Sequence, residues 1–126
     1  KIKNLYKNFT YFNEILRIAK KAEEKIHNSK NIVSDFSELL IKYWWYKKKL
    51  TKNVSNPKID SIYNYGIKKG AYAGKILGAG AGGFMMFLID PKKRSLFKES
   101  FKRYTVVPVK FESLGSQIIY HQDFNN

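Results

Sequence analysis

Two apolar segments of this sequence are joined by the glycine-rich stretch Lys75-Ile76-Leu77-Gly78-Ala79-Gly80-Ala81-Gly82-Gly83-Phe84. Residues 72–77 form a short apolar segment, and residues 84–89 form a continuous apolar run typical of a buried strand. Six of the eight glycines in the chain lie between positions 70 and 83. Because each glycine inside a regular element costs about 0.5–1 kcal/mol relative to alanine, this crowding favours a functional loop. The N–H groups of a backbone without Cβ atoms can approach phosphate oxygens closely, so the stretch is a candidate anion-binding loop.

Upstream of this stretch, the sequence predicts three helices. Over residues 9–26 the apolar positions recur every three or four residues, which places on one helix face Phe9, Phe12, Leu16, Ala19, Ala22 and Ile26. A second helix is expected from a capping residue at Ser34 or Asp35 to about residue 50. The pair Asn56-Pro57 is typical of an N-cap and first helical residue, and Gly70 supplies the stop of this third helix.

Downstream, the sequence predicts two strands, a helix and two further strands. The first two strands are residues 72–77 and 84–89, and Asp90-Pro91 opens a helix. Residues 106–111 alternate around Pro108 as a strand near a sheet edge, and residues 116–120 form the last strand. The expected fold class is therefore α+β, with a mainly antiparallel four-stranded sheet covered by helices. A chain of 126 residues has the length of one domain, so the domain is expected to span residues 1–126.

The composition limits the chemistry and the partners. The chain has no cysteine, which excludes disulfide scaffolds, thiolate metal sites and cysteine nucleophiles. The formal net charge of +14 favours nucleic acid or an anionic membrane as a partner. However, the basic residues are lysines spread along the chain, apart from Arg17, Arg94 and Arg103, whereas specific phosphate and base recognition favours arginine. We expect neither nucleic acid nor a membrane as partner, and a small basic nucleic-acid-binding module remains the alternative function.

The glycine-rich stretch also matches, in part, the patterns of a dinucleotide-binding loop, a P-loop and a membrane helix. Gly78, Gly80 and Gly83 fit G-x-G-x-x-G, but that dinucleotide fingerprint opens a helix and the following residues resemble a strand. Lys75 precedes the glycines, whereas the lysine of a P-loop follows them. Residues 71–89 carry one charge and could be taken for a membrane helix, but Lys75 lies inside that segment and amphipathic helices flank it. None of these patterns explains the stretch.

A resemblance to a known family explains it better. Gly70-Ala71-Tyr72-Ala73-Gly74-Lys75-Ile76-Leu77-Gly78-Ala79-Gly80-Ala81-Gly82-Gly83-Phe84 resembles the third motif of the GHMP kinases, the family of galactokinase, homoserine kinase and mevalonate kinase. Within the family, further segments resemble the sugar-phosphate kinases that act on D-glycero-D-manno-heptose 7-phosphate; these are Ser55-Asn56-Pro57-Lys58-Ile59-Asp60, Asp90-Pro91-Lys92-Lys93-Arg94, Val107-Pro108-Val109-Lys110-Phe111 and Gly115-Ser116-Gln117-Ile118-Ile119-Tyr120. The resemblance covers nearly the whole chain, but only the ferredoxin-like C-terminal domain of such an enzyme.

The resemblance implies ATP-dependent phosphorylation of a sugar phosphate by a cytoplasmic enzyme. The ATP-binding motif of the family, Pro followed by Gly-Leu-Gly-Ser-Ser-Ala, has no counterpart in the chain, so ATP and Mg²⁺ are expected to bind mainly to an N-terminal domain outside these residues. That domain is the expected partner, and the isolated chain is expected to be inactive. Carried over by position, the substrate- and phosphate-binding residues are Lys75, Gly78, Ala79, Gly80, Ala81, Gly82 and Gly83. The loop would act through its N–H groups, and no catalytic residue or metal ligand is expected here.

The aromatic run Tyr43-Trp44-Trp45-Tyr46 lies on the second predicted helix. Consecutive helical residues point about 100° apart, so the four rings cannot form one flat platform for stacking bases. We expect Tyr43 and Trp44 to continue the core-facing side. Trp45 and Tyr46 would then lie at or near the surface that the N-terminal domain covers, because unexplained exposed aromatic residues often mark interfaces.

Overall fold

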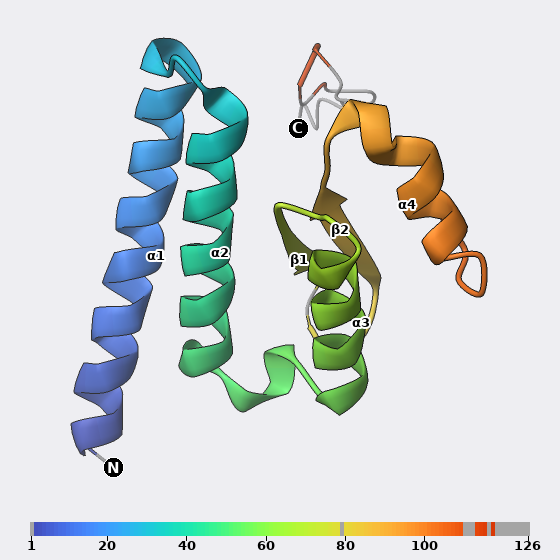
Figure 1. The fold of residues 1–126 in the computed structure, drawn as a ribbon. Helices are drawn as coiled ribbons and strands as arrows, with labels where there is room; N and C mark the ends of the chain where they lie inside the picture. Colours follow the sequence, from blue (N-terminus) through green and yellow to red (C-terminus); the bar gives the residue numbers. More distant parts are fainter. Residues whose placement is uncertain (1, 79, 110–112, 116, 118–126) are drawn as a thin grey trace, which may run out of the picture.

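The fold was analysed in a computed structural model, which describes residues 2–78, 80–109, 113–115 and 117. In chain order the elements are α1 (Ile2–Asn28), α2 (Ile32–Leu50), the 3₁₀ turn η1 (Lys52–Val54), α3 (Pro57–Lys68), β1 (Ala73–Leu77), β2 (Phe84–Leu88), the 3₁₀ turn η2 (Pro91–Lys93) and α4 (Arg94–Ser100). Helices α1 and α2 form a long hairpin, and α2 lies between α1 and the part of the chain that holds the two strands (Figure 1). The α+β class is confirmed.

The helix starts follow from side-chain caps. Asn56 caps α3 as expected, because its Oδ1 accepts a hydrogen bond from the Ile59 N–H at 3.0 Å, and Pro57 follows as the first helical residue. The cap expected for α2 at Ser34 or Asp35 is wrong. Asn31 is the cap, and its Oδ1 accepts from the Ser34 N–H at 3.2 Å. The helix can therefore begin three residues earlier, since asparagine caps as well as serine or aspartate does.

Asp35 instead joins the two long helices. Its carboxylate accepts a hydrogen bond from Ser29 Oγ at 2.7 Å, and Lys25 Nζ lies 3.1 Å from it. The Ser29 hydroxyl, and after it the Lys25 ammonium group, hold the pKa of this carboxyl below its usual value. The turn between α1 and α2 is thus fixed by a charge-assisted contact.

The first two predicted strands are confirmed and pair as an antiparallel hairpin. The register runs from Ala73 opposite Leu88 to Leu77 opposite Phe84. The third expected strand is wrong over residues 106–109, which adopt no strand and expose Val109 to 76%. Pro108 cannot donate a ladder hydrogen bond, and no other described strand pairs with this segment. Residues 110–111 and most of the fourth expected strand lie outside the described residues, so the described sheet has two strands.

The core lies between α2, η1, α3 and β1. Its central cluster consists of Trp44, Val54, Ile59 and Ile76, with Tyr63 and Met85 packed against it. On the same face of the hairpin, α3 approaches β2 closely at Gly66, where an added Cβ would lie 2.2 Å from the Phe87 ring. The absence of a side chain at Gly66 thus lets α3 approach β2. The central cluster separately holds α2 against β1, the strand that leads into the glycine-rich loop.

The apolar face predicted for the first helix does not pack against α2. Phe9 is 65% exposed and Phe12 56%, whereas Ile18, on a different face of α1, is buried. The inward face meets α2 through Tyr11, whose ring contacts the rings of Trp45 and Tyr46 at 6.3 and 6.1 Å between centroids. The spacing of apolar residues correctly indicated one apolar face, but it could not say which face the neighbouring helix would cover.

Candidate functional site

The glycine-rich loop joins β1 to β2 and makes a turn that few residues other than glycine adopt. The backbone φ angle is positive at Gly78 (111°), Gly80 (103°), Ala81 (59°) and Gly83 (110°). An added Cβ at Gly83 would lie 2.4 Å from the Leu77 carbonyl oxygen, so this position tolerates no side chain. Because a strand and not a helix follows the loop, the dinucleotide-binding reading of G-x-G-x-x-G is excluded.

The loop is held against η1 and the start of α3. The Ala81 N–H donates to the Val54 carbonyl oxygen at 3.3 Å, and Asn56 Nδ2 donates to the Ala81 carbonyl oxygen at 3.4 Å. At Gly80 an added Cβ would lie 2.9 Å from the Val54 Cα, which shows how closely the two backbones approach. Gly82 differs, since nothing lies within 4 Å of the Cβ it lacks. One side of the loop is therefore packed and the other is open.

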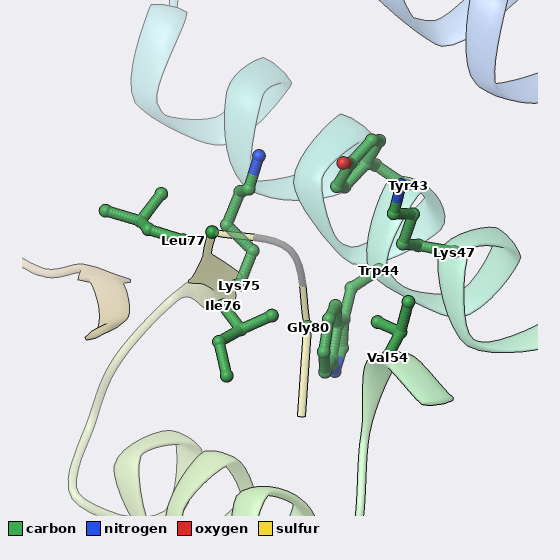
Figure 2. Close-up of a pocket in the computed structure, with 9 residues that line it drawn as sticks. Tyr43, Trp44, Lys47, Val54, Lys75, Ile76, Leu77 and Gly80 are labelled. Atoms are coloured by element: carbon green, nitrogen blue, oxygen red, sulfur yellow. The ribbon is translucent and has the colours of Figure 1, made fainter. Parts of the chain in front are cut away.

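A pocket of about 100 Å³ opens beside the loop, between α2 and β1 (Figure 2). The lining comes from α2, η1, β1 and the start of the loop, and consists of Tyr43, Trp44, Lys47, Val54, Lys75, Ile76, Leu77, Gly78 and Gly80. The Lys75 ammonium group lies 4.5 Å from the centroid of the Tyr43 ring, a cation–π contact between strand and helix. The pocket thus combines a loop backbone, two lysines and two aromatic rings.

The structure brings part of the predicted site to this pocket. Lys75, Gly78 and Gly80 line it, while Ala81, Gly82 and Gly83 belong to the same loop without lining the pocket. Ala79 lies outside the described residues.

Sequence reasoning missed Tyr43, Trp44 and Lys47 as lining residues. The available signal was the spacing of Tyr43 and Lys47, which are four residues apart and therefore share one helix face.

The expected positions of the four consecutive aromatic residues are mostly confirmed. Trp44 is 3% exposed and belongs to the core cluster, and Tyr43 is half-buried at the pocket. Trp45 is 50% exposed, and Tyr46 is half-buried. Both rings are partly covered by Tyr11 of α1 and stand outside the core cluster. Their burial by a further domain stays a prediction.

The described residues do not fit a metal site. No group of three or more histidine, aspartate or glutamate side chains gathers among them at a spacing that could hold a metal ion. The described helices also include none with the length and apolar character that crossing a membrane requires. The lining of the pocket itself includes lysines, aromatic side chains and two glycines of the loop.

Comparison with known proteins gives a family match over the part of the chain that holds the loop. The family described as "GHMP kinases C terminal" matches residues 48–106, which include the end of α2, the hairpin with its loop and α4. A D-glycero-alpha-D-manno-heptose 7-phosphate kinase from Campylobacter jejuni is 48% identical over 58 residues, or 46% of this chain. The matched segment spans 17% of the length of that relative. Residues 48–106 of this chain are therefore similar to the C-terminal domain of the GHMP kinases.

Proposed function

We propose that the chain is the C-terminal part of a cytoplasmic ATP-dependent kinase that phosphorylates D-glycero-D-manno-heptose 7-phosphate, in the biosynthesis of nucleotide-activated heptose. The observation that carries the proposal is the β1–β2 loop. It combines the glycine pattern of the family with a backbone pinned on one side by Val54 and open on the other at Gly82. The 48% identity to a heptose 7-phosphate kinase supports the choice of substrate.

The role of the loop follows from the demands of phosphoryl transfer. Catalysis of this reaction depends on positioning the reactants and stabilising charge on the moving phosphoryl group, with little covalent chemistry from the protein. Rigid N–H groups serve that purpose because they need no reorganisation during the reaction. The hydrogen bond from Ala81 to Val54 pins the loop on one side, and in this proposal other N–H groups of the loop bind a ligand on its open side.

ATP and magnesium are assigned to the rest of the enzyme. The described residues hold no cluster of three or more metal-ligating side chains, and in this proposal Mg²⁺ binds with ATP in the N-terminal domain. The proposed partner is the N-terminal domain of the same protein, which would supply the ATP site and the catalytic groups. The exposed aromatic residues of α1 and α2, among them Phe9, Phe12 and Trp45, provide apolar surface that such a domain could cover.

The proposal is tested with the protein extended by its natural upstream residues. Release of ADP is measured with heptose 7-phosphate, with unphosphorylated heptose and with no sugar. We expect turnover that depends on heptose 7-phosphate and is absent from the 126-residue chain alone. An extended protein that releases no ADP above the no-sugar control, although it folds, would contradict the kinase assignment. Tight, sequence-preferring binding of oligonucleotides at physiological salt would instead favour the basic nucleic-acid-binding module.

A loop variant tests the role of the backbone. Replacing Gly82 with valine places a side chain in the open space above the loop without a clash in this chain. We expect the extended enzyme to fold with unchanged stability and to lose at least about tenfold in turnover, as for removal of a positioned contact to the transition state. Unchanged kcat and KM would remove the open side of the loop from the mechanism.

A further inference from the structure

Ala81 holds a strained backbone conformation that the segment before α3 stabilises. Among the described residues it is the one non-glycine residue with a positive φ angle, 59°. This left-handed region disfavours a residue that has a Cβ, so the conformation persists only where the surroundings hold it. The Ala81 N–H donates to the Val54 carbonyl oxygen at 3.3 Å, and the Ala81 carbonyl oxygen accepts from Asn56 Nδ2 at 3.4 Å. Residues 54–56 thus hold both polar groups of this peptide backbone.

The side chain of Asn56 has a second partner, which fixes the direction of its amide. Its Oδ1 accepts a hydrogen bond from the Ile59 N–H at 3.0 Å as the cap of α3. Because only the amide oxygen can accept from an N–H, the Nδ2 end is the one that faces the loop. Val54 before Asn56 and Ile59 after it are both buried in the central cluster. The amide is therefore mounted on a backbone that the core holds in place.

The planar peptide bond carries this contact from Ala81 to Gly82. The carbonyl of Ala81 and the N–H of Gly82 belong to one peptide unit, and in a trans peptide they point in opposite directions. The described residues contain no cis peptide bond. Since the Ala81 carbonyl oxygen is turned toward Asn56, the Gly82 N–H is turned away from it. Within the described part of the chain this N–H donates to no backbone acceptor, and nothing lies within 4 Å of the Cβ that Gly82 lacks.

Glycine at position 82 leaves the orientation of this peptide unit to outside contacts. A residue without a Cβ accepts the backbone angles of either orientation, so a rotation of the unit by about 180° is sterically allowed there. The rotated unit would turn the Ala81 carbonyl oxygen, and not the Gly82 N–H, to the open side of the loop. An oxygen in that place repels an anion, whereas an N–H attracts one. The hydrogen bond from Asn56 selects the second arrangement.

We propose that Asn56 is a positioning residue of the kinase reaction, whose amide orients the peptide unit between residues 81 and 82 so that the Gly82 N–H faces the phosphate oxygens on the open side of the loop. The inference rests on the proposed function and deepens it, because it names the side chain that sets the loop for phosphoryl transfer. Asn56 acts through Gly82 and touches no reacting group. An N–H that is oriented in advance stabilises developing charge without reorganisation.

The variants Asn56→Ser and Asn56→Asp separate this role from helix capping. Serine and aspartate cap about as well as asparagine, so α3 keeps its cap in both. Neither keeps the donor to the loop, because the serine side chain is shorter and the aspartate carboxylate carries no proton. Asn31→Ala is the matched control, since Asn31 caps α2 at the end remote from Lys47 and the loop, and its loss lowers the midpoint of unfolding in urea at least as much.

Hydrogen exchange in the protein extended by its natural upstream residues tests the effect on the loop. We expect the Ala81 N–H to exchange about fivefold faster in both Asn56 variants, the ratio that corresponds to one typical hydrogen bond. In Asn31→Ala its rate should stay the same, because the loop opens locally. Unchanged exchange in both Asn56 variants would overturn the proposal, whether or not the protein is a kinase.

Kinetics of the same protein test the effect on the reaction. We expect kcat to fall about tenfold in both Asn56 variants, with the KM for heptose 7-phosphate and for ATP within about twofold, because the contact stabilises the transition state. Asn31→Ala should keep its kcat. A loss in Asn56→Asp alone would assign the effect to the added negative charge, and an equal loss in Asn31→Ala would assign it to stability. Either result would overturn the proposal.

The double variant Asn56→Ser with Gly82→Val tests whether Asn56 acts through Gly82. If the two residues act as one unit, the double variant loses no more kcat than Gly82→Val does alone. Losses that multiply would show that the two act independently, which contradicts the inference and leaves the kinase assignment intact. An extended protein that releases no ADP defeats the proposed function instead, and the exchange rate of the Ala81 N–H then still decides whether Asn56 holds the loop.

Discussion

Replacing Gly80 with alanine, and Gly82 with alanine as its matched control, separates the packed side of the loop from the open side. At Gly80 the backbone φ is +103°, and an added Cβ would lie 2.9 Å from the Val54 Cα and 3.2 Å from the Asn53 carbonyl oxygen. Holding a non-glycine residue in such a conformation costs about 1–3 kcal/mol. Moving the loop away from η1 to relieve the contact breaks the hydrogen bond from Ala81 to Val54, worth about 1 kcal/mol.

Whether the Gly80 variant keeps the strained backbone or loses the hydrogen bond from Ala81 to Val54, we expect its free energy of unfolding to fall by about 1–3 kcal/mol. At Gly82 the φ angle is not positive and the space is open, so alanine there is neutral or stabilising by about 0.4–1 kcal/mol through its effect on the unfolded chain. Urea unfolding followed by tryptophan fluorescence measures the difference, because Trp44 packs in the same cluster as Val54. Hydrogen exchange at the Ala81 N–H reports whether the loop stays pinned. Equal stability of the two variants, with equal protection of Ala81, would refute the account of the loop.

Three further predictions concern packing, charge and the exposed face of α1. Gly66→Ala should destabilise by about 1–3 kcal/mol despite the better helix propensity of alanine, because the added Cβ would lie 2.2 Å from the Phe87 ring; a raised midpoint in urea would contradict this. Asp35→Asn should destabilise at neutral pH and have no effect well below pH 3.8, since the lowered folded-state pKa of Asp35 gives stability that is lost as the pH falls through it. Unfolding measured at both pH values checks the sign, and a pH-independent difference would assign the effect to causes other than the charge. Phe12→Ser should change the free energy of unfolding by less than about 0.5 kcal/mol, because the side chain is exposed, and a larger loss in calorimetry would mean that this face belongs to the core.

Local chemistry made much of the fold predictable. Asn56-Pro57 starts a helix because a side-chain oxygen of residue 56 reaches an N–H three residues on, and no distant contact is needed for that. The β1–β2 hairpin was equally predictable from the sequence, since two short apolar runs flank a glycine-rich turn. The error at α2 was also local: Asn31, Ser34 and Asp35 are all good caps, and sequence spacing alone does not rank them. Residues 106–109 were misassigned because alternation signals a strand only when a partner strand is present.

The sequence by itself determined the helices, the hairpin and the presence of a glycine-rich loop, because hydrogen bonds and steric limits over a few residues decide those features. The tertiary structure decided which face of α1 remains exposed and where the loop is pinned. It also placed Lys47 and Lys75, 28 residues apart in the sequence, at one pocket. Their meeting depends on how α2 packs against β1 through Trp44 and Ile76, and burial of apolar surface between distant segments sets that geometry. The spacing of apolar residues within one segment does not show which face of another segment will pack against it.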